Sequence, residues 1–570
     1  MVSTTIPKRL KPRHSDVLAL VILLLLTFMS WLVAGPHGNF PNNDDWIYAG
    51  GVKSIVTTGR FQIPGSNAFN FIPIHLAAML CTMVGFSYPA LRCVSIFFHI
   101  LGVAGLYLSL RECRVSSGNA GILSSIYAFS PFLLNLSLSF MTDVPALAMC
   151  NWTIYFVLAA INRKSLRLFL VSMLALTAAM AIRQTSLVLL PPVLIAALLS
   201  LTQNRQRLLF LTSLMLPAVS FVLLQRWLAD SSTTAAQGNS QYSQLLISAF
   251  STITPLNLAE TFSKAACYVG LFLLPITIPL FFALPFKKGG KLPLLLSSIF
   301  STVLLATLIN VQRLGSIMPY FLNLFFPPIL GCYGLVGGVS VWKTVHVEKL
   351  TYFCDAMAVC WLFTLVFSVC GIKPDTTDQE ELLLVSRRKI AIILILFCTA
   401  AGTYLQLLTS AFDRYLLAVL APCIITLGPL WQRVCTIKLQ VVSTVLSIAV
   451  AAYGVIAAMD VMNFSRSQLS AITFLEQRGI SADRIDAGPA YTIPLGGAEF
   501  SKAFKQGIGW PESMRGKYSP GSIRWWPVIS DEFIIASVTL EGYEVVRSFT
   551  YWSPLSWKNK TVYVLKSKGN

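Results

Sequence analysis

Apolar stretches long enough to cross a membrane follow one another along most of the chain, about fifteen in all. Their centres lie near residues 25, 79, 100, 128, 153, 174, 193, 216, 273, 303, 329, 361, 400, 423 and 449. With 55% hydrophobic and only 12% charged residues, the chain is too apolar for an ordinary soluble protein. These features predict a polytopic α-helical membrane protein.

The basic residues give the chain a formal net charge of +19, but many of them are gathered in short loops between the apolar stretches. Such loops lie at 163–167, 205–207 and 287–291. Short basic loops remain on the cytoplasmic side of a membrane. The charge therefore indicates membrane topology, and no nucleic-acid partner is predicted.

Strict alternation of crossings conflicts with this charge pattern. If every apolar stretch crossed, the basic loops would all lie outside, so two stretches must fail to cross and about thirteen helices remain. We expect the first exception between residues 88 and 142, where the Pro131-broken run from Gly118 to Met141 is the candidate for folding back within the membrane. The second exception is expected between about 318 and 389. This arrangement puts the N-terminus inside and the residues after 460 outside.

The C-terminal part differs from the rest of the chain in its higher charge and mixed patterns. Ser465 to Arg478 has helical spacing of apolar residues. Strands are expected at 533–540, 543–549 and 561–565, with a turn at Glu541-Gly542. We therefore divide the chain into a transmembrane module, residues 1–460, and a small extracytoplasmic α/β domain, residues 461–570. The transmembrane module includes an outer loop, residues 35–70.

Two adjacent carboxylates, Asp44 and Asp45, follow the first apolar stretch after a few residues. Asn43 can cap a helix whose first turn holds both acids, and apolar residues from Tyr48 to Val56 recur on one face of that helix. This pattern predicts an amphipathic helix that lies on the bilayer. The acids have two interpretations: they only complement the positive end of the helix dipole, or one of them is a catalytic carboxylate.

Three further polar clusters interrupt apolar stretches on the predicted outer side. They are Thr142-Asp143-Val144-Pro145, Arg183-Gln184-Thr185 and Asp413-Arg414-Tyr415. Ionisable residues at such positions are costly and usually functional. Taken singly, Arg183 and Arg414 could snorkel to the interface, and Asp143 could cap the next helix. Because the clusters share one predicted side, we expect them to belong to one site.

Together, the segments Asp-Asp-Trp-Ile-Tyr-Ala, Thr-Asp-Val-Pro, Arg-Gln-Thr and Asp-Arg-Tyr-Leu-Leu, with the soluble tail, resemble the glycosyltransferase-C superfamily. The closer similarity is to the branch of the protein O-mannosyltransferases and the aminoarabinose transferase of lipid A. The resemblance implies a glycosyltransferase of the bacterial inner membrane that takes a sugar from a polyprenyl-phosphate donor on the periplasmic side. It also implies catalytic roles for Asp44, Asp45 and Asp143, and binding of the donor phosphate or substrate by Tyr48, Arg183, Gln184, Arg414 and Tyr415.

The family's first-loop motif is an Asp-Glu pair followed after a short gap by an aromatic residue. Asp44, Asp45 and Tyr48 map onto it, with Asp in place of Glu at the second position. This branch of the family mostly works without a metal, and the sequence has no CxxC or HExxH motif, so we expect no metal or other cofactor. Two adjacent acids could nevertheless bind a divalent ion.

The polar residues suit sugar transfer. An acceptor hydroxyl that attacks a sugar carbon needs a general base, whereas a phosphate leaving group needs charge stabilisation rather than a proton. Asp44 with Arg183 or Arg414 meets that need, while a hydrolase would require a paired acid and base. The acceptor, a glycan, a lipid or a protein, is not identified. Two alternatives remain: a transporter or flippase of lipid-linked glycans, and a polymerase or ligase of surface polysaccharide.

Overall fold

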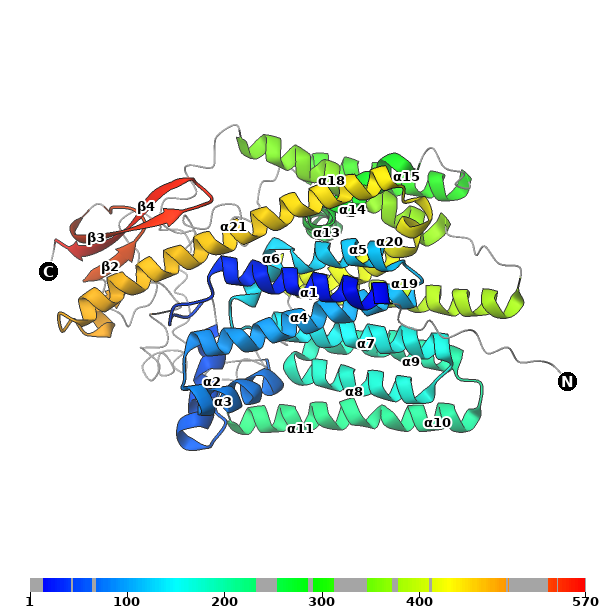
Figure 1. Cartoon of the computed structure of the whole chain (residues 1–570), viewed down its shortest axis with the longest axis horizontal. Helices are drawn as coiled ribbons and strands as arrows, with labels where there is room; N and C mark the ends of the chain where they lie inside the picture. The colour runs from blue at the N-terminus through cyan, green and yellow to red at the C-terminus, as the bar shows by residue number, and fades with distance from the viewer. Residues whose placement is uncertain are drawn as a thin grey trace.

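The computed structural model is a helical bundle with a small β-sheet at one end (Figure 1). It describes residues 14–42, 45–63, 68–231, 254–284, 291–311, 346–371, 378–409, 413–487, 491, 532–540 and 542–568. We call the end that carries the sheet the sheet end, and the opposite end, where the basic loop after residue 162 lies, the basic end.

The described residues form these helices in chain order: α1 (His14–Ala34), α2 (Asp45–Thr58), α3 (Phe71–Val84), α4 (Tyr88–Glu112), α5 (Ser117–Ala128), α6 (Pro131–Ser137), α7 (Asp143–Arg163), α8 (Leu166–Ile182), η1 (Gln184–Leu189), α9 (Leu190–Ser200), α10 (Asn204–Ser213), α11 (Met215–Ser231), α13 (Pro255–Phe272), α14 (Leu274–Ala283), α15 (Lys291–Val311), α18 (His346–Gly371), α19 (Gln379–Thr409), η4 (Asp413–Leu416), α20 (Leu417–Val434), α21 (Ile437–Glu476) and η5 (Ala482–Arg484). Within these residues, nine helices are long and apolar enough to cross a membrane, or up to eleven if each bent pair counts as one span. The fold is therefore that of a polytopic membrane protein.

Ion pairs and hydrogen bonds fix which helix ends share the basic end. Asp16 at the start of α1 pairs with Arg111 at the end of α4, at 2.9 Å. Glu112 pairs with Arg163 at the end of α7, at 2.5 Å, and its carbonyl oxygen accepts a hydrogen bond from Arg388 of α19. The prediction that the basic loop near 163 and the basic residues near 388 lie on one side is thus confirmed.

Helix α3 begins and ends at the sheet end. Before it, the backbone N–H of Asn70 donates to the carbonyl oxygen of Ile182, the last residue of α8, at 2.9 Å. After it, the N–H of Tyr88 donates to the side-chain oxygen of Asn39 in the first outer loop, at 3.0 Å. With 14 residues, α3 rises only about 21 Å, less than the roughly 30 Å of a hydrocarbon core. The first stretch that does not cross is therefore α3.

The expectation of an exception between residues 88 and 142 is wrong in position. A break does occur at Pro131, where α5 and α6 meet at 63°. Ser116 before α5 contacts Gln432 near the end of α20, at the basic end, whereas Leu138 after α6 contacts Asn42 at the sheet end. The bent pair therefore runs from one end of the bundle to the other. The charge pattern required one exception in this part of the chain but did not determine which apolar stretch it was.

Part of the second expected exception, between about 318 and 389, lies outside the described residues, because 312–345 and 372–377 are not among them. The N-terminal half of α19 is described and starts at the basic end, where Lys164 pairs with Glu380 at 2.5 Å. The helix then runs toward η4 at the sheet end. This direction agrees with the predicted sides of Arg388 and Arg414.

The placement of α3 gives a topology prediction. A reporter inserted after residue 86 should appear on the same side of the membrane as reporters inserted after residues 60 and 470, because α3 returns to the end where it began. Reporters after 165 and 206 should appear on the opposite side. Accessibility to a membrane-impermeant label measures this. If the reporter after 86 shares the side of the one after 165, then α3 crosses and the arrangement described above fails.

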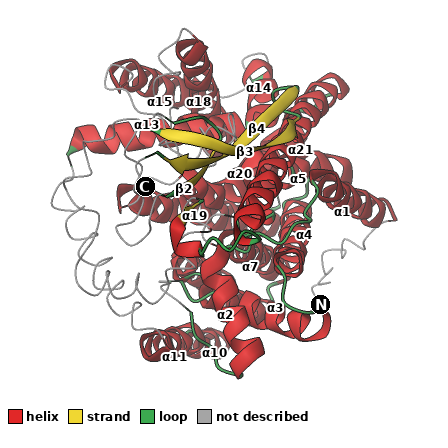
Figure 2. Cartoon of the chain, turned by 90° about the vertical axis from the view of Figure 1, so that its left-hand side faces the viewer, coloured by secondary structure: helices red, strands yellow, loops and turns green. Residues whose placement is uncertain are grey.

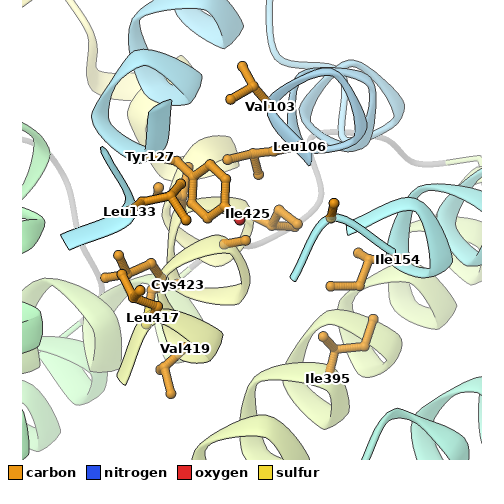
Figure 3. Close-up of a cluster of buried hydrophobic side chains, with 14 of the residues drawn as sticks. Val103, Leu106, Tyr127, Leu133, Ile154, Ile395, Leu417, Val419, Cys423 and Ile425 are labelled. Carbon is orange, nitrogen blue, oxygen red and sulfur yellow. The ribbon is translucent and has the colours of Figure 1, made fainter. Parts of the chain in front are cut away.

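A buried cluster of apolar side chains joins the central helices (Figure 3). It includes Val103 and Leu106 of α4, Tyr127 of α5, Ile154 of α7 and Ile425 of α20. Helices α4 and α7 approach closely, since a Cβ built on Gly102 would lie 3.1 Å from the Cα atom of Ala148. Small residues permit this kind of packing between membrane helices. The cluster thus packs the middle of α7 and of α20 against α4 and α5.

Helix α21 is continuous for 40 residues, about 60 Å, and carries the sheet on its C-terminal part (Figure 2). The predicted boundary at residue 461 falls inside α21, and the predicted helix Ser465 to Arg478 is largely the end of α21. Ile472 and Leu475 of α21 pack with Phe533, Val562 and Val564 of the sheet. The predicted α/β domain is therefore joined to the bundle by unbroken helix rather than by a linker.

The sheet has the strand order β1-β2-β4-β3 and is formed by β1 (Ile485–Asp486), β2 (Phe533–Ala536), β3 (Tyr543–Ser553) and β4 (Lys558–Ser567). The three strands expected from the sequence are present. Gly542 has a φ of 83° in the turn after β2, a conformation that suits glycine. Nevertheless β2 pairs with β4 and not with β3, so this turn does not form a hairpin.

Candidate active site

Three of the polar clusters meet at the sheet end, each at the end of a helix. Asp143 is the first residue of α7, Arg183 follows the last residue of α8, and Arg414 and Tyr415 lie in η4. Asp143 and Arg183 form an ion pair. The guanidinium carbon of Arg183 lies 4.9 Å from the ring centroid of Tyr415, and that of Arg414 lies 5.7 Å from it. Residues far apart in the sequence thus form one charged cluster.

Burial distinguishes between the interpretations of this cluster. The side chain of Asp143 is 4% exposed and that of Arg183 is 17% exposed. Arg183 therefore pairs inward with Asp143 and does not snorkel to the interface. Because Oδ1 of Asp143 pairs with Arg183, this carboxylate does more than cap a helix, and within the described residues its Oδ2 has no hydrogen-bond partner. In the part of the chain that the structure describes, the cluster brings the guanidinium groups of Arg183 and Arg414 together around the ring of Tyr415, with the carboxylate of Asp143 paired to Arg183.

A cavity of about 660 Å³, part of it open to solvent, begins at this cluster. Its polar wall is formed by Asp143, Arg183, Thr185, Ser186, Thr399, Thr403, Gln406, Arg414 and Tyr415, and the remaining wall by Ala146, Leu147, Cys150, Asn151, Ile154, Val188, Leu189, Gly402, Ala418 and Pro422. Along α7 the lining extends from Asp143 to Ile154, a rise of about 17 Å. The cavity therefore has charged residues at one end and a long, mainly apolar remainder between α7, α19 and α20.

Two of the predicted binding residues lie beside the cavity. Tyr48 is buried in α2 and is close enough to interact electrostatically with Arg183. Gln184 starts η1 and does not line the cavity, although the next two residues, Thr185 and Ser186, do. Tyr48 can therefore support Arg183, while the contact expected of Gln184 stays a prediction.

The two acids of the first loop differ in what the structure describes. Asp44, like Asn43, lies outside the described residues. Asp45 is 1% exposed, and its Oδ1 accepts a hydrogen bond from the backbone N–H of Asn42 at 2.8 Å. Its Oδ2 accepts from the N–H of Phe140 at 3.4 Å. Asp45 thus joins the start of α2 to the segment that leads into Asp143.

The first outer loop is held by Arg92 of α4, a residue that the sequence analysis did not single out. Arg92 is fully buried and donates to the carbonyl oxygens of Pro36, Gly38, Phe40 and Leu138 at 2.5 to 2.9 Å. It is an ionisable residue inside an apolar stretch, and this signal could have identified it. Its side chain ties the loop that precedes the acids to the segment that precedes Asp143.

A second arginine binds the same loop from α21. Arg466 donates to the carbonyl oxygens of Gly35 and His37 at 3.0 and 3.3 Å. The pKa of His37 is lowered because the ring is partly buried and because the guanidinium groups of Arg466 and Arg92 are close. The loop is therefore clamped between α4 and α21.

Replacing Arg92 with methionine should destabilise the protein by about 3 kcal/mol or more, because several buried carbonyl oxygens lose their donors at roughly 1 to 3 kcal/mol each. The first outer loop should also become more sensitive to proteolysis. Thermal unfolding and limited digestion measure these effects. The control is Arg111→Met, which breaks an ion pair at the basic end. Equal protease sensitivity of the loop in both variants would show that Arg92 does not hold it.

Metal binding finds no support in the part of the chain that the structure describes, where no three His, Cys, Asp or Glu side chains are grouped as a metal site. Asp44 is not included in that statement, so the expected metal-free site stays a prediction.

Residues 71–228 match the family described as dolichyl-phosphate-mannose-protein mannosyltransferase. No curated protein sequence matches the chain. Among solved structures, ArnT from Cupriavidus metallidurans in the apo state is similar over 97% of this chain and 98% of its own, with 10% identity and a TM-score of 0.41. The S. cerevisiae Pmt1-Pmt2 complex bound to the sugar donor is similar over 38% of this chain, with 15% identity and a TM-score of 0.32, and the match spans 34% of that chain's length.

Arabinosyltransferase EmbB from Mycobacterium smegmatis is similar over 81% of this chain and 44% of its own, with 12% identity and a TM-score of 0.33. With TM-scores this low, the interpretation of the site rests on this chain's own residues. The family match includes α7, α8 and the Asp143–Arg183 pair between them. Over residues 71–228, therefore, the chain is similar to the dolichyl-phosphate-mannose-protein mannosyltransferase family.

Proposed function

We propose that this protein transfers a sugar from a polyprenyl-phosphate donor to a hydroxyl or phosphate group of a glycan, lipid or protein acceptor. The observation that carries the proposal is the cluster of Asp143, Arg183, Arg414 and Tyr415 at one end of a long, mainly apolar cavity. The guanidinium groups of Arg183 and Arg414 suit the donor phosphate, and the apolar interior suits a prenyl chain. The matching family is described by a dolichyl-phosphate sugar, which is a donor of this class.

The reaction is a single displacement in this proposal. The acceptor oxygen attacks the anomeric carbon, a carboxylate takes the acceptor's proton, and the bond from that carbon to the phosphate oxygen breaks. The lipid phosphate leaves with its negative charge, which the arginines stabilise. One displacement inverts the configuration of the sugar carbon. Asp44 is the proposed base, because Asp45 already accepts two backbone hydrogen bonds.

The proposal also sets the orientation. The basic end faces the cytoplasm of a bacterial inner membrane, and the sheet end faces the periplasm. The donor's headgroup and the acceptor meet there, and the sheet domain lies beside the site.

Purified protein supplied with a radiolabelled polyprenyl-phosphate monosaccharide and extracts of cell-envelope acceptors tests the activity. We expect release of polyprenyl phosphate together with label in an acceptor. The control is the purified Asp44→Asn variant, assayed under the same conditions. Movement of an intact donor between leaflets without any release would favour the lipid-linked glycan transporter instead.

A further inference from the structure

Two tryptophans lie together on the surface at the tip of the β3–β4 hairpin. Trp557 is 80% exposed and Trp552 is 43% exposed. Their ring centroids are 5.5 Å apart, with the rings inclined at 71°. Trp557 also has a φ of 51°, a conformation that bulky residues rarely adopt. The chain thus accepts backbone strain at the position that exposes a large aromatic ring.

The hairpin tip is attached to one level of α21. The N–H of Leu555 donates to Oδ1 of Asp460 at 3.4 Å, and the side-chain amide of Asn463 donates to the carbonyl oxygen of Trp552 at 2.8 Å. Asp460 and Asn463 lie within one turn of the helix, so these contacts hold the tip at one level of α21. The position of the tryptophans along the axis of α21 is therefore set by the positions of Asp460 and Asn463.

The length of the exposed apolar part of α21 can be compared with the thickness of a bilayer. Exposed apolar side chains follow α21 from Ile437, which is 79% exposed, to Ile456, which is 36% exposed. This length of helix rises about 29 Å, which equals the roughly 30 Å thickness of a hydrocarbon core. Asp460 lies one turn further, about 6 Å above the end of the apolar stripe. The hairpin tip is therefore at the level of the lipid headgroups.

Basic residues follow the aromatic pair directly. Lys558 is exposed next to Trp557, and the half-buried Lys560 lies two residues further along β4. Tryptophan is enriched in the headgroup region, where its ring is apolar and its N–H can bond to water or lipid, and lysine attracts anionic lipid. The position of the hairpin tip, its tryptophan side chains and its positive charge are therefore all consistent with a location among the lipid headgroups.

We propose that Trp552 and Trp557, with Lys558, form a membrane anchor that holds the sheet domain against the headgroups of the bilayer that contains the bundle. The partner is the lipid surface itself, with a preference for anionic headgroups. The anchor does not depend on the sugar-transfer reaction, since it requires only that the bundle spans a membrane.

The full chain, labelled with 5-fluorotryptophan and placed in lipid nanodiscs, provides the test. Resonances of the two residues are assigned with Trp552→Phe and Trp557→Phe. A nitroxide attached to the lipid headgroup should relax both resonances several-fold more strongly than that of Trp361, which is buried at the middle of the apolar span Tyr352–Gly371 in α18. A water-soluble gadolinium chelate should act on them less strongly than the headgroup label does.

A matched pair of charge variants tests the preference for anionic lipid. Lys558→Glu should weaken the effect of the headgroup label in nanodiscs that contain phosphatidylglycerol. Lys568→Glu should not, because Lys568 is exposed at the far end of β4, about 33 Å away along the strand. Strong relaxation of Trp557 by the chelate, with a headgroup effect no greater than that on Trp361, would overturn the anchor. In that case, a shift of the tryptophan resonances on addition of soluble glycan would assign the pair to sugar stacking.

Discussion

Asp44→Asn should lower the rate of sugar transfer by about 10² to 10⁴-fold while leaving donor affinity near normal. Asparagine keeps the shape of the side chain and one hydrogen-bonding oxygen, but it cannot take a proton from the acceptor. Binding of the donor should survive, because the positive groups that hold the phosphate are Arg183 and Arg414 in the proposed mechanism. Single-turnover transfer and separate donor titration measure the two effects.

Asp45→Asn is the matched control, and its effect should fall mainly on stability. Asp45 accepts hydrogen bonds from the N–H groups of Asn42 and Phe140, so the variant loses part of a buried network at a cost of about 1 to 3 kcal/mol. A dead but folded Asp45→Asn with a near-normal Asp44→Asn would exchange the roles. Near-normal transfer in both would end the carboxylate-base hypothesis.

Arg183→Ala should have two separable consequences. Loss of a contact made mainly in the transition state should slow transfer by about 2 to 4 kcal/mol of barrier. Loss of the cation beside the buried Asp143 should also destabilise the fold by about 3 to 5 kcal/mol. Arg183→Lys should recover only part of the transfer rate, because lysine lacks the planar fork of arginine. Rates and unfolding midpoints are measured for each variant.

Three companion variants separate these consequences. The double variant Arg183→Met, Asp143→Asn should recover much of the stability without recovering transfer. Arg414→Ala should reduce transfer by a similar factor. Arg163→Ala, which breaks an ion pair at the basic end, should leave transfer unchanged. If Arg183→Ala and Arg414→Ala both transfer sugar normally while folded, these arginines do not hold the donor phosphate.

Much of the charged cluster could be predicted because an ionisable side chain in an apolar stretch is conspicuous and costly. Asp143, Arg183 and Arg414 were found in this way. Arg92 belongs to the same class, yet its partners are backbone carbonyl oxygens 46 to 56 residues away, and no sequence pattern marks them. The role of Asp45 was equally hidden, because its donors are also backbone groups.

The path of the chain was less predictable than the cluster. Apolar composition is the same for α3, which stays at one end, as for a helix that crosses, and only its length and its neighbours distinguish them. The three strands could be predicted from alternation, but their order could not, because the backbone of β2 pairs with β4 and not with β3, the strand next to it in sequence. Local patterns therefore identified the elements, and long-range contacts decided how they are arranged.

Because α21 is unbroken, it fixes the direction in which the sheet domain faces relative to the membrane bundle. Each residue of helix advances 1.5 Å and turns about 100°, so inserting one residue between Ile456 and Asp460 would swing the whole sheet domain sideways by that angle. Inserting seven residues would raise the domain by roughly 10 Å while nearly preserving its direction. When sheet domains are exchanged between related proteins, the junction in α21 must therefore keep the same rotation about the helix axis, and not only the same length, for the domain to face the same cavity.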